Sequence, residues 1–241
     1  MAPTTRRAPA RRATSGQSPG RAKKTQKTAA RGRGAPRTGL TRAERFAQTH
    51  ERIITASAIA FDRGGYLGVN LSLVLRDDLG MTKGALYDHF PDGKDELVAA
   101  IIDAHNNAVD QLYNESVAVE YDPLAALVRW TRAMARAMQA DPIARAGSRL
   151  AIERNLIADL DIIDPYTDWT RRAAKLLRRA AAEGLLREGI DTAAVARALT
   201  GSFFGIQQMS MALKDRRDLL DRLDEYWDLL LPGLRPARRH R

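Results

Sequence analysis

The chain has 241 residues, 44% of them hydrophobic and 28% charged, which is enough for one or two folded domains with a real core. The absence of cysteine excludes disulfides, cysteine-ligated zinc and a thiol nucleophile, and the four histidines show no metal-ligand spacing. No apolar run approaches the roughly 20 residues of a membrane-spanning helix. We therefore expect a soluble, cytoplasmic protein without cofactor or metal.

The formal charge of +10 is distributed unevenly along the chain. Residues 1–42 contain twelve Lys or Arg and no acidic residue, and residues 235–241 contain four Arg. Residues 43–234 contain 23 basic and 29 acidic residues, a net charge of −6. The basic character therefore belongs to the two ends, and an anion site in the body must be local.

The first 42 residues predict a disordered basic tail. They are mainly Arg, Lys, Ala, Pro, Gly, Ser and Thr, and such a composition cannot bury enough apolar area to offset the entropy of ordering. Three roles are open: a solubilising tail, a transit peptide, or an arm attracted to DNA phosphates. Scattered Pro and Gly argue against the amphipathic helix of a transit peptide, and a DNA-binding body would favour the third role.

From residue 43 onward the pattern is helical. The spacing of Ile53, Ser57 and Phe61 predicts a first helix that Gly64 and Gly65 end. The next three predicted helices are a short one capped by Asn70 and ended by Gly80, one from Lys83 to His89 capped by Thr82, and, after the Pro91-Asp92-Gly93 turn, a long one from Asp95 to Glu115.

Asp-Pro pairs are typical helix starts and recur in the second half of the chain. The predicted helices there begin at Asp122-Pro123, Asp141-Pro142 and Asp164-Pro165 (the last ended by Gly184), and then run from Asp191 to Leu213 and from Asp215 to Leu231, before Pro232-Gly233. No segment shows sustained strand alternation, so the sequence predicts an all-α protein of eight or nine helices.

The two short helices joined at Gly80 have the arrangement of a helix-turn-helix, whose second helix enters the major groove of DNA. That helix begins with Thr82, Lys83, Gly84 and Ala85, a hydroxyl and a cation followed by two very small residues. Glycine destabilises a helix by about 1 kcal/mol, so its presence favours a backbone that must approach base edges closely. The Lys83 ammonium suits guanine O6 and N7.

Polar side chains next to these residues suit phosphate contacts. Tyr87 and His89 offer polar tips, while Leu86 and Phe90 face the core, and Lys94 begins the following helix where free amides also attract phosphate. Each of these residues taken singly is more often a solvated charge or a half-buried core residue. Their order and spacing together favour a DNA-binding surface.

The segment from Ile53 to Leu97 resembles the TetR family of bacterial transcriptional regulators. The resemblance rests on Phe61-Asp62-Arg63-Gly64-Gly65-Tyr66, on Gly80-Met81-Thr82-Lys83-Gly84-Ala85-Leu86-Tyr87-Asp88-His89-Phe90, and on Lys94-Asp95-Glu96-Leu97. It implies an operator-binding homodimer, with a helix-turn-helix domain in 43–97 and a ligand-binding and dimerisation domain in 98–234, followed by the basic tail 235–241. The candidate DNA contacts are Asn70, Ser72, Thr82, Lys83, Gly84, Ala85, Tyr87, His89 and Lys94.

The second half is similar to one subgroup of that family, the receptors of actinomycete γ-butyrolactone-type signalling molecules. The similar pieces are residues 141–150, 165–169 and 203–208. The resemblance implies that Trp169 lines a ligand pocket and that Tyr166 reaches the polar head of the ligand. We expect this pocket to be bounded by the long helix 95–115 and by the helix 165–183. The candidate ligand-binding residues are Trp130, Tyr166, Trp169, Phe203 and Gln207. For Trp130, however, packing within the helical bundle is the favoured interpretation.

Small residues in 193–205 and an apolar face in 215–231 indicate half of a four-helix dimer interface, with packing inside one chain as the alternative. The sequence thus predicts a nucleoid-associated repressor that a γ-butyrolactone-like effector releases from its operator. Alternatives are a pseudo-receptor, or another TetR-type regulator with a different ligand or none, and a sequence-neutral architectural DNA binder. An enzyme is not expected, because no convergent acid, base or nucleophile set is visible.

Overall fold

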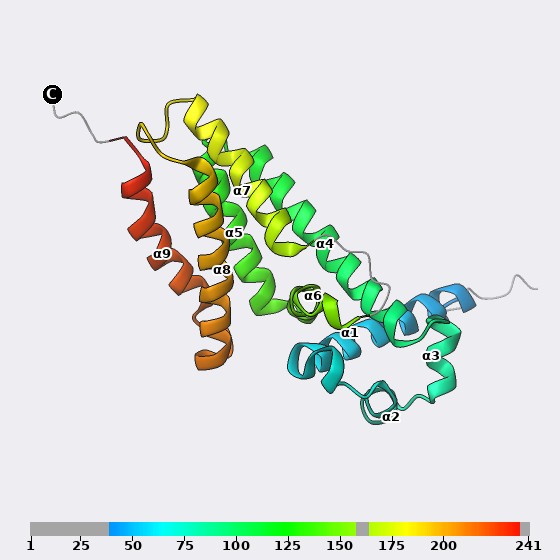
Figure 1. Cartoon of the computed structure of the whole chain (residues 1–241). Helices are drawn as coiled ribbons and strands as arrows, with labels where there is room; N and C mark the ends of the chain where they lie inside the picture. Colours follow the sequence, from blue (N-terminus) through cyan, green and yellow to red (C-terminus); the bar gives the residue numbers. More distant parts are fainter. Residues whose placement is uncertain (1–38, 158–163, 237–241) are drawn as a thin grey trace, which may run out of the picture. The chain divides into compact units, whose positions relative to one another are not determined.

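The structure is a computed structural model that describes residues 39–157 and 164–236, and in these ranges it contains helices and no strand (Figure 1). The all-α prediction is confirmed, and none of the described helices is both long and apolar enough to cross a membrane. The helices are α1 (Arg42–Gly68), α2 (Leu71–Leu79), α3 (Lys83–His89), α4 (Lys94–Val119), α5 (Pro123–Ala140), α6 (Pro142–Ile152), the 3-10 turn η1 (Arg154–Leu156), α7 (Pro165–Ala182), α8 (Thr192–Lys214) and α9 (Leu219–Leu234).

Side-chain caps start most of these helices, as the sequence predicts. Asn70, Thr82 and Asp191 each accept a hydrogen bond from a backbone N–H in the first turn that follows. Thr41 and Glu44 form a reciprocal capping box that starts α1. Because the first amides of a helix have no partner inside it, these short polar side chains decide where each helix begins.

Several predicted helix boundaries differ from the structure, and α4, for example, continues past Glu115 to Val119. Gly65 leaves the helical region (φ 66°), but the chain continues for one more helical turn to Gly68. The positive φ favours glycine there, and a Cβ would in addition lie 2.6 Å from both carboxylate oxygens at the end of the Glu153 side chain, which would have to shift.

The last helix also differs from its prediction. Asp215 and Arg216 adopt left-handed conformations (φ 50° and 60°), so α9 begins at Leu219 rather than at Asp215. It continues through Pro232 to Leu234, because proline in the final turn removes few of the hydrogen bonds that a helix interior would lose.

The buried side chains form two clusters that share α4. The first cluster joins α1, α2, α3 and the start of α4 (Leu97 to Ile102), and α6 adds Ala146 and Leu150 to it. The second joins the later part of α4 with α5, α7, α8 and α9. Figure 1 shows α4 running from the region of α1–α3 into the remaining helices. The sequence predicts a boundary between two domains at residues 97/98. Because α4 contributes to both clusters, and α6 packs in the first cluster although it follows residue 98, this boundary stays a prediction.

The crossing of α4 and α6 is unusually close. A Cβ added to Gly147 would lie 2.2 Å from the Cβ of His105 and 3.2 Å from the carbonyl oxygen of Ile101. Glycine at 147 therefore lets α6 pack directly against the middle of α4.

Candidate functional site

The α2–α3 pair has the helix-turn-helix arrangement that the sequence predicts. Gly80 adopts the left-handed conformation (φ 64°), and its N–H donates to the carbonyl of Leu75. Leu71, Leu75 and Leu86 are buried and hold the two helices against α1. The polar flank of α3 is thereby left on the surface.

The start of α3 presents small and polar groups to solvent. Thr82, Lys83, Gly84 and Tyr87 are exposed, and Ala85 is half-buried. Among atoms outside its own backbone, only the Thr82 hydroxyl oxygen, at 3.7 Å, would approach a Cβ at Gly84. A base edge could therefore approach this backbone without meeting another side chain, although the DNA contacts themselves stay predictions.

The start of α2 places Asn70 and Ser72 on the surface as well. The Asn70 side-chain oxygen accepts a hydrogen bond from the Ser72 backbone N–H (3.0 Å), so Asn70 acts as a helix cap. Nearby, the carboxylate of Asp77 pairs with the guanidinium of Arg76 at 2.6 Å. This pairing reduces the repulsion that an acidic residue next to DNA would exert.

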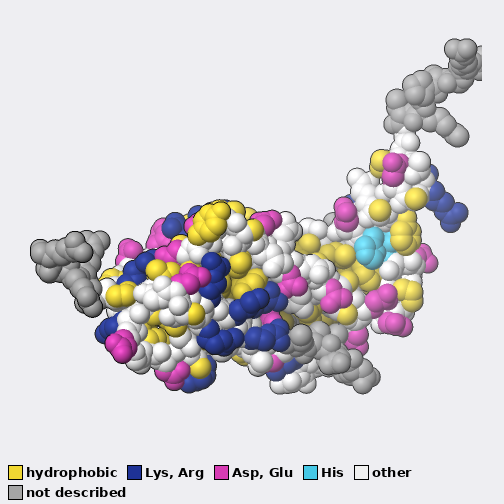
Figure 2. Space-filling view, turned by 90° about the horizontal axis from the view of Figure 1, so that it is seen from above, with side chains coloured by type: hydrophobic (Ala, Val, Ile, Leu, Met, Phe, Trp, Pro, Cys, Tyr) yellow, Lys and Arg dark blue, Asp and Glu magenta, His cyan; other side chains and the backbone are white. Residues whose placement is uncertain are grey.

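His89 is packed against α1. Its ring stacks on Phe46 with centroids 4.0 Å apart, and His50 stacks on Phe90 at 4.5 Å. Figure 2 shows histidine surface lying among hydrophobic side chains. Burial, and secondarily the charge of His50, lowers the pKa of His89, so its ring favours the neutral form. A phosphate contact by His89 stays a prediction, to which the structure adds a packing role.

Lys94 joins the start of α4 to the end of α1. Its ammonium donates to the carbonyl oxygens of Tyr66 (2.5 Å) and Val69 (2.9 Å) and lies 4.5 Å from the centre of the Tyr66 ring. Tyr66 in turn donates its hydroxyl to Asp95 at 2.6 Å, which raises the pKa of Tyr66 to about 12. Burial lowers the pKa of Lys94. Two of its three N–H donors are therefore occupied, and a phosphate contact stays a prediction for the third.

A cavity of about 430 Å³ lies between α4 and α7, the two helices between which the sequence predicts a pocket. Trp169 and Val109 supply buried apolar wall, while polar residues of both helices form the remainder. The lining residues are Asp103, His105, Asn106, Val109, Asp110, Pro165, Asp168, Trp169, Arg171 and Arg172. The cavity thus combines an aromatic surface with hydrogen-bonding groups, which is typical of small-molecule sites.

The aromatic wall is a stack of three rings. Trp169 lies between Trp130 (centroids 4.5 Å) and Phe203 (4.6 Å), and Tyr113 contacts Trp130 edge-on. Trp130 is 1% exposed, and its buried N–H has no partner among the described residues. Trp130 and Phe203 therefore hold Trp169 in place, and the packing interpretation of Trp130 agrees with this position.

The other two candidate ligand residues belong neither to the three stacked rings nor to the lining of the cavity. Tyr166 is 41% exposed and meets Phe204 edge-on at 4.7 Å. Gln207 is buried on α8. Their contact with a ligand stays a prediction.

Of the residues that line the cavity, sequence reasoning named only Trp169 as a ligand contact, and it missed His105 and Arg172 among the others. His105 is 5% exposed, its Nδ1 has no partner among the described residues, and burial lowers its pKa to about 4. Arg172 pairs with Asp168 (2.6 Å) and Asp110 (2.5 Å), which joins α7 to α4 across the cavity. No sequence signal separates these residues from an ordinary core histidine and a surface arginine.

Part of the exposed surface of α8 and α9 is apolar. Met209 is 63% exposed, Leu213 72% and Leu229 82%, and no atom lies within 4 Å of a Cβ built at Gly201 or Gly205. Such a surface on two adjacent helices is typical of an interface with another chain.

Comparisons with known proteins fit this geometry. A family model described as tetracyclin repressor-like, C-terminal domain, matches residues 121–236. The A-factor receptor protein of Streptomyces griseus is 33% identical over 195 residues, which cover 81% of this chain and 67% of that protein.

Two solved structures are similar as well. CprB from Streptomyces coelicolor, in complex with its biological operator sequence, is 34% identical with a TM-score of 0.72, covering 81% of this chain and 92% of that chain. A γ-butyrolactone receptor described as ArpA-like is 33% identical with a TM-score of 0.66, covering 81% and 91%.

The helix-turn-helix and these matches define a class, that of DNA-binding transcriptional regulators. The chain belongs to the TetR family of regulators, and within it the chain is similar to the A-factor and γ-butyrolactone receptors.

Proposed function

We propose that this regulator is a homodimeric repressor, and that a γ-butyrolactone-like effector bound between α4 and α7 releases it from its operator. The observation that carries the proposal is the cavity itself. It is bounded by Trp169 on one helix and by His105 and Val109 on the other. A lactone is a compact apolar ring with a polar carbonyl, and the cavity offers an aromatic wall beside hydrogen-bonding groups.

The path from cavity to DNA follows α4. Its first two turns pack with α1 in the core that holds α2 and α3, and its later turns line the cavity. A ligand that moves α4 therefore changes the position of α3 relative to the dimer axis. Release requires that the effector prefer the conformation that does not bind DNA, because equal affinity for both conformations would shift nothing.

A titration of operator release tests the effector site. The operator is first obtained by selecting bound genomic fragments, and a defined γ-butyrolactone series and actinomycete culture extracts are then titrated into the complex. Trp169→Ala is expected to keep operator binding and to lose release. Tyr121→Ala removes an aromatic residue that is 92% exposed and is expected to respond like the wild type. Equal release of wild type and Trp169→Ala would exclude Trp169 from the effector site.

A second measurement tests base readout by α3. Lys83→Ala is expected to weaken operator binding by about 1–3 kcal/mol and to relax the preference at one base pair of each half-site. Lys175→Ala removes an exposed lysine of α7 and should change neither. Unchanged base preference in Lys83→Ala would mean that another surface reads the sequence.

The proposed dimer is supported by the exposed apolar side of α8 and α9. Leu213→Glu places a charge on this side, and light scattering is expected to show a monomer where the wild type is a dimer. A wild-type monomer at micromolar concentration would contradict the proposal.

Two alternatives have distinct outcomes in these tests. A pseudo-receptor, or a regulator with another ligand, would bind the operator but would not respond to any lactone of the series. An architectural binder would show equal affinity for every duplex and no effect of Lys83→Ala.

The basic residues 1–38 lie outside the described residues, and we propose that the tail adds phosphate contacts at the nucleoid. Deleting residues 1–40 is then expected to reduce the salt slope of binding by about 0.9 per lost contact without changing the operator.

A further inference from the structure

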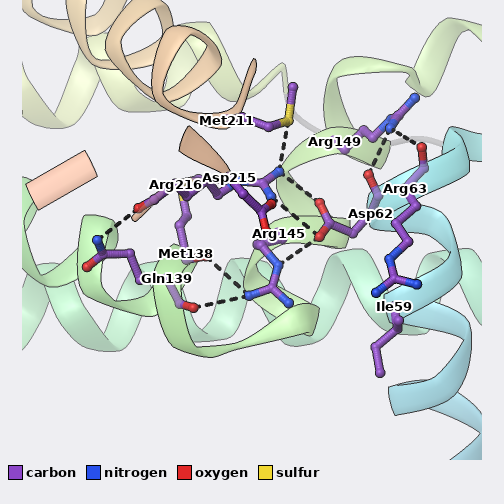
Figure 3. Close-up of a pocket in the computed structure, with 10 residues that line it drawn as sticks. All are labelled: Ile59, Asp62, Arg63, Met138, Gln139, Arg145, Arg149, Met211, Asp215 and Arg216. Carbon is purple, nitrogen blue, oxygen red and sulfur yellow. Dashed lines mark hydrogen bonds and ion pairs between the residues drawn. The ribbon is translucent and has the colours of Figure 1, made fainter. Parts of the chain in front are cut away.

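A second cavity, of about 510 Å³, lies where α1, α5, α6 and the turn between α8 and α9 meet (Figure 3). Its charged lining consists mainly of arginines. The lining residues are Ile59, Asp62, Arg63, Met138, Gln139, Arg145, Arg149, Met211, Asp215 and Arg216. The proposed effector site is a separate cavity, which lies between α4 and α7 and is lined by Trp169 of α7.

One carboxylate in this cavity serves two guanidinium groups. Asp62 accepts hydrogen bonds from Arg145 Nε at 2.7 Å and from Arg216 Nη2 at 2.8 Å. The Arg216 side chain is 7% exposed, and its Nε has no hydrogen-bond partner among the described residues. Because a buried guanidinium is stable when it is paired, a single carboxylate between two of them leaves positive charge uncompensated.

The neighbouring charges do not remove this excess. Arg149 pairs with Glu153 at 2.8 Å and also donates to the backbone carbonyl of Asp62. Arg63 is exposed and makes no ion pair with any residue in the described ranges. Asp215 is the other acidic residue of the lining. The four arginines of the lining are thus accompanied by only three carboxylates, those of Asp62, Asp215 and Glu153, which leaves an excess of one positive charge.

We propose that this cavity binds a small anion that carries a carboxylate or a phosphate group, held by Arg63, Arg145 and Arg216. A guanidinium presents two parallel N–H donors that match the two oxygens of either group. The side chains of Met138 and Met211 supply apolar surface for the remainder of such a molecule. The site goes beyond the proposed effector function, since it is built from α1, α6 and the α8–α9 turn.

Methionine methyl signals provide a local test in the full-length protein. The chain has six methionines, of which Met138 and Met211 line the cavity, whereas Met81 lies next to α3 and Met209 on the exposed side of α8. With ¹³C-methyl methionine, inorganic phosphate and succinate are titrated separately, with chloride keeping the ionic strength constant. We expect saturable shifts of the Met138 and Met211 methyl signals with at least one of the two anions, and no matching shift at Met81 or Met209.

Matched arginine variants show whether the cavity is responsible. Arg63→Gln and Arg145→Gln are expected to weaken the affinity measured at Met138 and Met211 by about tenfold. Arg178→Gln removes an exposed arginine of α7 and should leave it unchanged. The basic tail is identical in all variants, so its own attraction for anions cancels. Arg63 is exposed, so its replacement keeps the test valid if Arg145→Gln unfolds. Shifts that do not saturate, or that Arg63→Gln leaves unaltered, would overturn the proposal.

Discussion

The helix-turn-helix and the helices around the cavity between α4 and α7 differ in what positions their candidate functional side chains. In α2 and α3 the positions are set locally, by the caps Asn70 and Thr82 and by the left-handed turn at Gly80. Around the cavity they are set by contacts between distant segments, such as the stacking of Trp169 between Trp130 and Phe203. Side chains positioned by local caps and turns keep their places when distant parts of the chain change. Side chains positioned by close packing between helices move when those helices move.

The same difference between the two regions is seen at two glycines, Gly84 and Gly147. Gly84 on α3 is exposed, and a Cβ there would meet only the Thr82 hydroxyl oxygen, at an ordinary contact distance of 3.7 Å. Gly147 on α6 has no space for a Cβ, because it permits the contact with α4. Tertiary packing therefore explains glycine at 147, whereas no packing contact requires glycine at 84, where a close approach of DNA stays a prediction.

The largest expected effect is that of Gly147→Ala. The added methyl would lie 2.2 Å from the Cβ of His105, so α6 and α4 must separate. We expect a loss of about 3 kcal/mol in the free energy of unfolding, the upper part of the range for overpacked cores. Urea denaturation measures it, and a loss below 1 kcal/mol would show that this crossing is not rigid.

The next effect concerns pH and the cavity. Burial, opposed in part by Asp141, lowers the pKa of His105 to about 4, whereas an unfolded chain titrates near 6.5. The unfolded state therefore binds more protons between these values, so the stability is complete above pH 6.5 and falls as the pH decreases toward 4. From pH 7 to pH 5 this single group should lower the free energy of unfolding by about 2 kcal/mol.

His105→Gln isolates this contribution. Its stability should fall less than that of the wild type over the same pH range, because the other histidines are retained in both proteins. Parallel curves of stability against pH would contradict a buried neutral His105.

Substitution of Lys94 and of Lys83 distinguishes a lysine that stabilises the fold from one that we expect to contact DNA. Lys94→Met removes an ammonium that donates to two carbonyl oxygens and should lower the free energy of unfolding by about 1.5 kcal/mol. Lys83→Met removes an exposed ammonium and should leave stability unchanged while weakening operator binding. Thermal unfolding of both variants checks this, and equal stability of the two would refute the structural role of Lys94.

The smallest effect is expected for Gly84→Ala, and its sign is opposite to that of Gly147→Ala. Alanine in an unobstructed helical position should raise the free energy of unfolding by about 1 kcal/mol. The same methyl should lower operator affinity, because it occupies the surface that we expect a base edge to approach. A variant that gained stability and kept full affinity would show that DNA does not approach this backbone closely.

The sequence by itself determined the helices and the DNA-binding unit. Asn70, Gly80 and Thr82 act through hydrogen bonds and backbone conformations within a few residues, so their roles are readable in the linear chain. It also indicated a pocket between the fourth helix and the helix that begins at Pro165, where a cavity is found. The predicted start of α9 was wrong. The chain forms a left-handed turn at Asp215 and Arg216, and the sequence there contains no glycine or asparagine, the residues that usually indicate such a turn.

Only the tertiary structure decided how distant residues combine. It turned Lys94 toward the carbonyl oxygens of α1, buried His105 against α6, and brought Asp62, Arg145 and Arg216 together from three segments of the chain. Hydrogen bonds and close contacts between residues that lie from 25 to 154 positions apart depend on how whole helices pack. Periodicity and capping describe each helix alone, and for that reason they leave these partners undetermined.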